Sequence, residues 1–586
     1  MALLRVAAGI AAAALVLGVA ELVAVFTGAG SAPAYALGAT VVDHTPDGLR
    51  EWAIQSFGRN DKAVLFVCMG VVAAVVAGLA GWLERVTRPV GSIVFAVFGV
   101  VAAVIGAGRI GGISGALPAL IGTAAGILVL RGLARRIDAM PSPPASTGVE
   151  PGVGRGVGPD DGAKALGGES PDGATDRAPV AGGAITAGSS GATATGSSAT
   201  TADASGETAI GRGATTGRAA IAAEESRVAV TAGRRRVLGG IAATGVMAIG
   251  AGLAGRLLGG ARTDVTAERS TVELPGPATP LPELPADADL RVPGLTSYLT
   301  PADDFYRIDT ALILPQVSTA DWSLRIHGMV DREIRLTWDD LARRTPVEHL
   351  VTLACVSNPI NGDLIGNARW LGYRLDELLA EAGPHPDADM VLSHSKDGWT
   401  AGSPLAALTD GRDALLAIGM NGAPLPVQHG YPARLVVPGL YGYVSATKWV
   451  TELEVTRFDR ATAYWTRRGW SAQGPIKTGT RIDTPRGRGR IPQGRTTIAG
   501  VAWAQHRGIT GVEVQIDNGE WRPARLSTEV SIDTWRQWVY DWDATTGPHT
   551  IRARAIDNTG VPQTAVEQDV VPDGATGYPT VTLQVA

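Results

Sequence analysis

Cysteine is scarce in this chain of 586 residues, which contains only Cys68 and Cys355. Two cysteines so far apart exclude a disulfide-stabilised scaffold and any zinc or iron–sulfur site built from cysteine alone. No C-x-x-C-H segment occurs, so no c-type haem is expected. Charge is also low, because charged residues make up 18% of the chain against about 25% in an ordinary soluble domain. With a net charge of −5 the chain lacks the basic excess that neutralises phosphates, so nucleic acid is not expected as a partner.

Long apolar runs, by contrast, are frequent in the first 140 residues. Four of them lie at residues 4–26, 63–82, 90–107 and 113–130. Each run is close to the roughly 20 residues that cross a bilayer as a helix. The first run could be a signal peptide, but three further runs follow it, and we favour a membrane anchor. Buried core helices are the other alternative, and four runs with so few charges argue against them. Residues 1–140 are therefore predicted to form a four-span transmembrane domain.

Arginines next to these runs predict the orientation in the membrane. The short segments after the second and fourth runs carry Arg85, Arg88, Arg131, Arg135 and Arg136. Since positive residues remain on the cytoplasmic side, both segments are expected in the cytoplasm, together with the N-terminus. The hydrophilic loop at residues 28–62 is then expected outside.

The next segment, residues 141–233, has no Phe, Trp or Tyr and a single leucine. Nothing in it can offset the entropy of ordering the chain, so it is predicted to be a disordered cytoplasmic linker. Three arginines at 234–236 then precede an apolar run, which predicts a fifth transmembrane helix at residues 234–258. This segment resembles a twin-arginine export signal, with Arg234 and Arg235 as the pair; the alternative is a positive flank and nothing more. Recurrent prolines predict an extended tether at residues 259–300.

Two segments of the remaining chain contain residues suited to chemistry. Residues 348–354 form a short apolar run that predicts a buried strand, with Cys355 at its end and a loop after it. A cysteine at that place can face a pocket, although a lone cysteine is more often a small buried apolar residue. In the turn-rich segment 420–439, His429 and Arg434 could converge on an anion such as phosphate. A loop with a solvated arginine is the equally good alternative.

From about residue 299 to residue 586 the chain resembles the sulfite oxidase family of molybdenum enzymes. The resemblance is carried by Phe305-Tyr306-Arg307, the strand that leads to Cys355, Ala368-Arg369-Trp370, the segment 420–439 and Lys448-Trp449. It implies an α+β sulfite-oxidase-like molybdopterin domain at residues 301–472 and an immunoglobulin-like β-sandwich dimerisation domain at residues 473–586. Short alternating segments separated by turn residues in this last part, such as 497–503 and 549–555, fit an antiparallel sandwich on their own.

The resemblance also implies a cofactor and its residues. Cys355 is expected to give a thiolate to molybdenum, whose other ligands come from molybdopterin and oxo groups. No haem is expected. The positions that match contacts of the family with the cofactor are Phe305, Tyr306, Arg307, Asp397, His429, Arg434 and Lys448. Cys355, Arg307 and Trp470 are the expected catalytic residues. A twin-arginine export route would fit such a cofactor, because it carries proteins that have already folded around one.

Three departures from the family pattern concern the substrate. Sulfite-oxidising members have an arginine shortly after the cysteine, where this chain has Pro359 and Ile360. Trp470 stands at the position of the family's active-site tyrosine, and Asp309 replaces a histidine. Since a charge-assisted contact contributes about 1.5–3 kcal/mol, the loss of a cation argues against sulfite as the specific substrate.

The sequence thus predicts a multi-domain chain with N-terminal transmembrane helices, multi-pass in the cell membrane, and an extracytoplasmic oxidoreductase domain. Oxygen-atom transfer on a small-molecule or sulfoxide substrate is the expected reaction, with a separate electron-transfer partner. A reductase of S-oxides or N-oxides, such as methionine sulfoxide, is the first alternative. A non-catalytic, membrane-tethered binding protein is the second. A homodimer through the C-terminal domain is the assembly that the family suggests.

Overall fold

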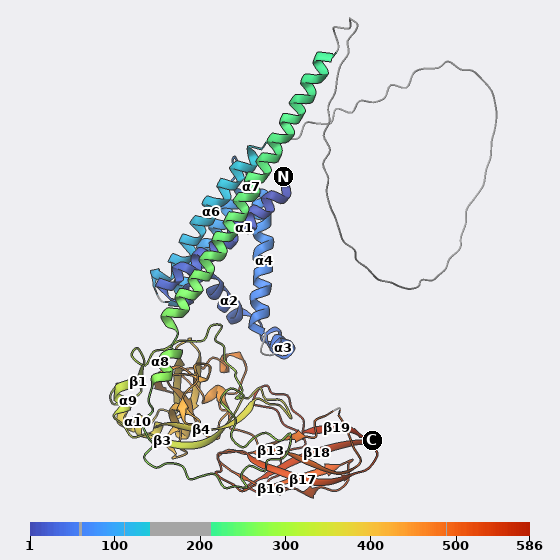
Figure 1. The fold of residues 1–586 in the computed structure, drawn as a ribbon. Helices are drawn as coiled ribbons and strands as arrows, with labels where there is room; N and C mark the ends of the chain where they lie inside the picture. The colour runs from blue at the N-terminus through green and yellow to red at the C-terminus, as the bar shows by residue number, and fades with distance from the viewer. Residues whose placement is uncertain (58–60, 111, 141–212, 488) are drawn as a thin grey trace, which may run out of the picture.

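The computed structural model describes residues 1–57, 61–110, 112–140, 213–487 and 489–586. A bundle of long helices forms one end of the molecule, and a strand-rich region forms the other (Figure 1). The long helices are α1 (Ala2–Thr27), α4 (Asp61–Leu83), α5 (Val90–Ile110), α6 (Leu117–Asp138) and α7 (Gly213–Thr263). Each contains a stretch that is long and apolar enough to cross a membrane. The prediction of five such helices is confirmed.

Small residues allow the helices of the bundle to approach closely. A Cβ atom added to Gly9 of α1 would lie 2.1 Å from the carbonyl oxygen of Ala77 in α4. A Cβ atom added to Gly18 would lie 2.3 Å from the carbonyl oxygen of Ala248 in α7. Such backbone contact is how helices associate in lipid, where burial from water contributes nothing between them. Helix α1 is therefore the centre of the bundle, with α4 and α7 against it.

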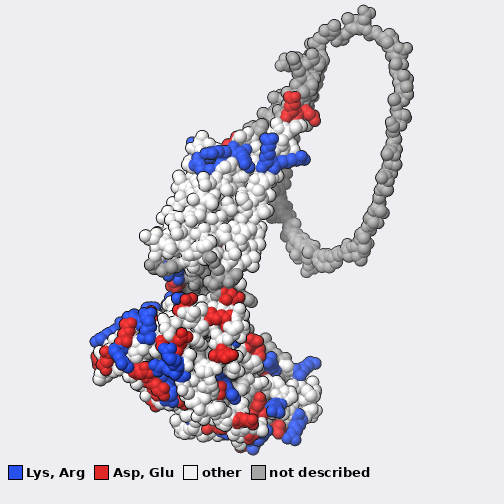
Figure 2. Space-filling view, turned by 60° about the vertical axis from the view of Figure 1, so that its left-hand side comes forward, with Lys and Arg blue, Asp and Glu red and all other residues white. Residues whose placement is uncertain are grey.

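On the face of the bundle shown in Figure 2, the described residues form a broad belt without charged side chains. In Figure 2, Lys and Arg side chains form a band at the end remote from the strand-rich region, and uncharged atoms fill the surface between the two. Arg5 of α1 pairs with Asp138 of α6 and donates a hydrogen bond to the backbone oxygen of Glu84. The N-terminus, the turn after α4 and the end of α6 therefore lie together at this basic end.

The hydrophilic segment 28–62, predicted as a loop, is instead largely helical. It contains α2 (Pro33–His44) and α3 (Asp47–Phe57). Pro33 begins α2 with a backbone angle that already suits a helix, and Ala36 is fully buried against the bundle. The segment is hydrophilic because of its acidic residues, but its run of small residues favours a helix.

The predicted linker is wrong in its last part. Its first part, residues 141–212, lies outside the described residues. Helix α7 begins at Gly213 and continues through Thr263, so residues 213–233 are helical and the fifth helix extends well beyond the predicted 234–258. Alanine, glutamate and arginine are frequent before the apolar run and favour helix. A lack of aromatic residues excludes a packed core but does not prevent a helix.

The predicted tether at 259–300 is packed against the strand-rich region and is not a free spacer. It includes the short helix α8 (Thr266–Thr271), and Val265, Ala288 and Tyr298 are buried. Arg269 donates hydrogen bonds to the carbonyl oxygens of Pro424 and Leu425, at 2.6 and 2.7 Å. The prolines do keep this segment extended, but its apolar side chains complete the neighbouring core.

Two sheets build the first half of the strand-rich region. In the first, the order is β2 (Ile334–Thr337), β1 (Ser323–Gly328), β10 (Val450–Thr456), β5 (Met390–Ser395) and β6 (Thr400–Pro404). In the second, it is β3 (Val347–Ala354), β4 (Ile365–Arg374), β7 (Leu415–Met420) and β8 (Ala423–Pro424), with β9 (Arg434–Val436) also paired to β7. Three short helices accompany the sheets: α9 (Trp338–Ala342), α10 (Leu375–Ala382) and α11 (Leu405–Thr409). This half has the predicted α+β character.

The last part of the chain folds as two facing sheets. One has the order β11 (Gly479–Thr484), β13 (Gly494–Trp503), β17 (Arg536–Ala544) and β16 (Arg525–Leu526). The other has the order β12 (Arg490–Ile491), β19 (Thr580–Val585), β18 (Gly547–Asp557), β14 (Ile509–Ile516) and β15 (Arg522–Pro523). Ile498 and Trp538 of the first sheet pack against Val514 and Ile551 of the second. The strands predicted from alternation are found, and they form a sandwich.

Candidate functional site

Cys355 lies where the sequence places it, directly after strand β3. Its backbone N–H donates to the oxygen of Leu364 at 2.9 Å, and its own oxygen accepts from Asn358 at 3.1 Å. These bonds fix the loop that leads from β3 into β4. The side chain is 8% exposed. A buried thiol at the end of a rigid strand is held in one position, as a metal ligand must be.

Aromatic rings surround the approach to this thiol. Phe305 stacks on Tyr306 with ring centroids 5.2 Å apart, and it meets His429 edge-on at 5.6 Å. Burial, together with the negative charge of Cys355, raises the pKa of Tyr306 far above its ordinary value. Tyr306 is therefore a neutral hydrogen-bond donor close to Cys355. The expected motif at residues 305–307 and the expected cysteine are thus brought together.

Arg434 is a buried cation that contacts backbone oxygens and the ring of Trp370, whose centroid lies 5.1 Å from the guanidinium carbon. It is 4% exposed, and its guanidinium donates to the oxygens of His429, Ala446 and Leu435 at 3.2 to 3.3 Å. Among the described residues it has no carboxylate partner. Burial lowers its pKa to about 10. Since an uncompensated buried charge is costly, this arrangement calls for an anion from outside the chain.

His429 presents an unused acceptor in the same place. Its Nε2 lies 2.9 Å from the oxygen of Ala302, so Nε2 carries the proton. Its Nδ1 is buried without a hydrogen-bond partner. Burial, followed by the nearby charges of Arg434 and Lys448, lowers the pKa of His429 to about 4, so the ring is neutral near pH 7. A donor group of a bound molecule would satisfy Nδ1, and buried polar atoms without partners are otherwise rare.

Three cations meet one carboxylate beside these residues. Lys448 Nζ lies 3.1 Å from Asp309 Oδ2, and Arg307 Nε lies 2.8 Å from the same oxygen. The third cation is Lys62 of the helical bundle, 2.9 Å from Asp309 Oδ1. Burial opposes ionisation of Asp309, but Lys448, Arg307 and Lys62 together hold its pKa well below the ordinary value. We refer to Lys62, Arg307, Asp309 and Lys448 as the Asp309 cluster.

Lys448 has an environment that favours a bound anion. Burial lowers its pKa to about 8, although Asp309 opposes this shift. Its ammonium group also donates to the oxygen of Gln428 at 3.1 Å. A phosphate would add a second negative partner and would keep this lysine charged.

Asp397 and Trp470 are placed differently from the other predicted residues. Asp397 lies in the turn between β5 and β6, where its carboxylate accepts from Trp399 N–H at 3.1 Å. The turn is next to the cluster, because Lys396 N–H donates to the oxygen of Trp449. Trp470 is buried in the apolar core, with its ring 5.9 Å from Tyr443 and 6.3 Å from Trp465. The structure does not bring Trp470 together with the cation cluster.

A cavity lies beside Cys355 between the two strand-rich parts. Its lining includes Asn358, Pro359, Ile360, Tyr441, Lys477, Trp503 and Gly577. Lys477, its one lining cation among the described residues, is already bound to Asp573 at 2.8 Å and to the oxygen of Gly574 at 2.8 Å. Pro359 and Ile360, which replace the family's arginine, therefore face a pocket with little free positive charge.

Sequence reasoning missed Tyr441, Lys477 and Lys62. Burial, then Asp573 and Cys355, raises the pKa of Tyr441 to about 12, so this tyrosine lies close to the cysteine. Tyr441 could have been identified from the sequence, because it follows the Val-Pro-Gly turn of the matched segment. Lys477 belongs to the C-terminal part and Lys62 to the bundle, and neither has a local pattern that points to the site.

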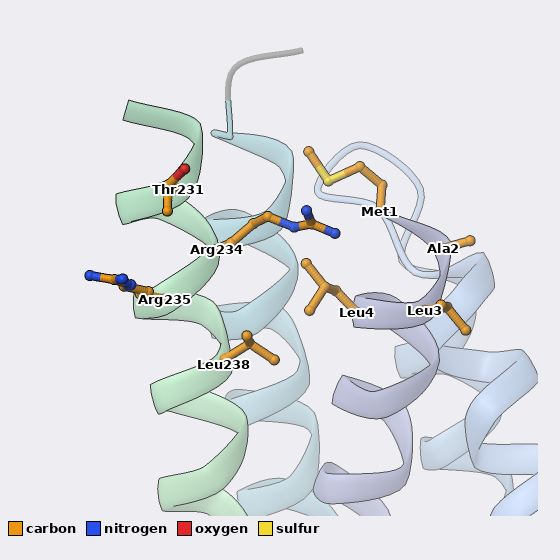
Figure 3. Close-up of a pocket in the computed structure, with 8 residues that line it drawn as sticks. All are labelled: Met1, Ala2, Leu3, Leu4, Thr231, Arg234, Arg235 and Leu238. Carbon is orange, nitrogen blue, oxygen red and sulfur yellow. The ribbon is translucent and has the colours of Figure 1, made fainter. Parts of the chain in front are cut away.

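The arginine pair of the twin-arginine-like segment lies within α7. It borders a pocket with the N-terminal residues of α1 (Figure 3). Arg234 points toward Met1 and Leu4, whereas Arg235 points away from α1. Both residues lie beside Met1, and the N-terminus is remote from strand β3, which leads to Cys355 (Figure 1). They take no part in the cofactor site described here.

The residues around Cys355 fit the expected cofactor. The features that a metal–pterin phosphate would satisfy are the acceptor without a partner on His429, the buried Arg434 without a carboxylate partner among the described residues, and the nearby Cys355 thiol. No group of three or more His, Cys, Asp or Glu side chains is placed to hold a metal within the described part of the chain. A molybdenum site of the expected kind differs from such a group, because the cofactor supplies most ligands.

Comparisons with known proteins match the strand-rich region of the chain to molybdopterin oxidoreductases. A family profile described as "Oxidoreductase molybdopterin binding domain" matches residues 311–465. Sulfite oxidase of Gallus gallus is 28% identical over 293 residues, which cover 42% of this chain and 63% of that protein. The uncharacterized oxidoreductase YuiH of Bacillus subtilis is 31% identical over 153 residues, covering 26% of this chain and 74% of YuiH. The crystal structure of the sulfane dehydrogenase SoxCD from Paracoccus pantotrophus aligns with a TM-score of 0.42 at 25% identity, over 46% of this chain and 75% of that one. The chain thus spans less than two thirds of the length of the sulfite oxidase.

Proposed function

Because the chain belongs to the sulfite oxidase family of molybdopterin-dependent oxidoreductases, we propose that Cys355 is the thiolate ligand of a molybdenum–molybdopterin cofactor. The observation that carries this proposal is the group of unsatisfied residues next to the thiol. Arg434 is buried without a counter-ion, and Nδ1 of His429 is buried without a donor. A cofactor with a phosphate and a pterin ring supplies both missing partners.

The side chains around Cys355 indicate where the phosphate and the pterin ring of the cofactor would lie. Arg434 and Lys448 would hold its phosphate with N–H donors in a region shielded from water, and Arg307, whose side chain is 39% exposed, would add donors from the solvent side. The neutral His429 would accept a hydrogen bond from the ring system through Nδ1, next to the stacked rings of Phe305 and Tyr306. Tyr306 keeps its proton and can donate near the metal. When bound, the cofactor supplies a molybdenum centre that exchanges an oxygen atom and two electrons with the substrate.

The residues beside Cys355, which line a cavity of about 30 Å³, favour a substrate of low charge. Ile360 and Pro359 are apolar, and Lys477 is neutralised by Asp573. A small dianion such as sulfite would meet no free cation from these residues. Oxygen-atom transfer on a small uncharged substrate is therefore the proposed reaction, and reduction of S-oxides or N-oxides is the second candidate that the same pocket favours. Electrons pass to or from a separate protein.

The bundle anchors this enzyme in the cell membrane, with the oxidoreductase domain on the outer face. The basic end of the bundle, which holds the N-terminus and Arg5, is remote from the strand-rich region (Figure 2). Positive residues are retained on the cytoplasmic side, which supports this orientation. The sandwich provides the surface for the expected homodimer.

Replacement of the thiol tests the proposal. The full chain, purified in detergent, is expected to contain molybdenum and pterin. In Cys355→Ser the sulfur neighbours of molybdenum, counted by X-ray absorption, should fall by one, and turnover should be lost. Rates of sulfite oxidation and sulfoxide reduction by the wild type would then distinguish the two reactions. A wild-type chain that contains no molybdenum would refute the proposed enzymatic function.

A further inference from the structure

The helical bundle touches the oxidoreductase domain at the Asp309 cluster. Lys62 lies at the outer end of the membrane-spanning helix α4, and its ammonium group makes three contacts with the other domain. It lies 2.9 Å from Asp309 Oδ1, 3.2 Å from the backbone oxygen of Asp309 and 2.6 Å from that of Ala311. These three contacts join the ammonium group to residues 309–311.

Helix α2 makes a second contact at the same face. A Cβ atom on Gly38 would lie 3.4 Å from a methyl carbon of Leu312 and 3.4 Å from the ring of Phe66 in α4. Burial, then the charge of Asp397, raises the pKa of Tyr35, which places Tyr35 near that carboxylate. In Figure 1, α2 and the outer end of α4 stand over the strand-rich region. The bundle therefore meets the two loops that carry Asp309 and Asp397.

The charges of the cluster explain why a lysine is needed there. Arg307 and Lys448 both bind Oδ2 of Asp309, and these are the cations that a phosphate requires. A carboxylate with 6% of its side chain exposed would compete for them and would repel the phosphate. Lys62 binds the other oxygen, Oδ1, at 2.9 Å, where Arg307 makes only a longer contact of 3.4 Å, and so neutralises the carboxylate from the membrane side.

We propose that Lys62 is a further residue of the phosphate site, so that the bundle completes the cofactor pocket of the oxidoreductase domain. Lys62 acts as a positioning residue: it occupies Asp309 and leaves Arg307 and Lys448 to the cofactor. The inference rests on the proposed molybdopterin function. It adds that cofactor binding by the oxidoreductase domain depends on a residue of the helical bundle. The membrane unit is then part of the cofactor site as well as an anchor.

The test compares cofactor retention among variants of the full chain in detergent. Molybdenum and pterin per chain are followed over time after dilution for the wild type, Lys62→Gln, Lys62→Arg, Asp309→Asn and the double variant Lys62→Gln/Asp309→Asn. Arg109→Gln is the matched control, because Arg109 pairs with Asp43 inside the bundle. Melting temperature is measured in parallel, so that loss of fold is separated from loss of cofactor.

Lys62→Gln is expected to lose pterin roughly tenfold faster than the wild type, which corresponds to the loss of about one charge-assisted contact. Lys62→Arg and Arg109→Gln should stay within about twofold of the wild type. In the Asp309→Asn background, the effect of Lys62→Gln should nearly vanish, since no carboxylate remains to neutralise. Asp309→Asn alone should retain pterin at least as long as the wild type, which tests the idea even if Lys62→Gln does not fold.

Two results would overturn the inference while leaving the enzyme intact. One is a wild type that carries molybdenum together with a Lys62→Gln variant that retains it equally well. The other is an undiminished Lys62→Gln effect in the Asp309→Asn background, which would make Lys62 a contact between domains and nothing more. A wild type without molybdenum or pterin would instead reject the proposed function itself.

Discussion

Buried charge without a counter-ion is the residue-scale feature that distinguishes this site. Arg434 and the neutral His429 occur five positions apart in a turn, and the sequence alone left a solvated loop as an equal alternative. The structure removes that alternative, because both residues are buried. Proximity in sequence made the pair predictable. Lys62 and Asp309 lie 247 residues apart, and no local pattern could have joined them.

His429 gives the residue-scale prediction. Its pKa in the folded chain is about 4, below the ordinary value of 6.5. As the pH falls, the unfolded chain therefore binds this proton first, and the folded state loses stability between about pH 7 and pH 4. The full loss is about 3 kcal/mol, and it is absent above pH 7.

Chemical unfolding of the cofactor-free chain at several pH values measures this loss. The difference in unfolding free energy between wild type and His429→Gln should change across this window and stay constant above pH 7. A constant difference throughout would contradict a neutral, buried imidazole.

At the scale of elements, periodicity and length predicted most helices and strands. Alternation in the last part of the chain predicted strands within β13, β14, β17, β18 and β19. The wrong predictions concern segments that were assigned from amino-acid composition alone and not from the spacing of their residues. Residues 213–233 were assigned to a linker because they lack aromatics, yet alanine-rich sequence continues α7 through them. Packing between elements was not predictable, because it depends on which glycines face a neighbour.

Gly18 of α1 gives the element-scale prediction. A side chain there would meet the backbone of Ala248 in α7 at 2.3 Å, so Gly18→Ala must push the two helices apart. Overpacking of this kind costs typically about 1–3 kcal/mol. The matched control is Gly245→Ala in α7, where an added methyl meets nothing within 4 Å.

Thermal unfolding in detergent provides the measurement. Gly18→Ala should melt several degrees below the wild type, and Gly245→Ala should melt with it or slightly above, since alanine favours helix. Equal melting of the two variants would show that α1 and α7 do not pack as described.

For the whole molecule, the domain boundaries predicted from sequence are too sharp. Tyr298, from the predicted tether, donates a hydrogen bond to Thr534 at 2.9 Å and accepts one from Trp535 of the sandwich. Val501 and Trp535 share an apolar core with strands of the oxidoreductase part. Composition separates regions along the chain, but long-range packing joins the tether and both strand-rich parts. The contact of Lys62 with Asp309 extends this continuity to the membrane unit.

The orientation of the molecule in the membrane is its last testable property. If all five apolar helices cross the membrane, the two ends of the chain lie on opposite sides, and the arginines at the N-terminal end of the bundle favour the cytoplasm for that end. An alkaline phosphatase fused after Ala586 should therefore be active in intact cells, because this enzyme matures only outside the cytoplasm. The same reporter fused after Ala139, at the end of α6, should be inactive. The reverse pattern would place the cofactor site in the cytoplasm, while activity at both positions would mean that one of the five helices does not span the bilayer.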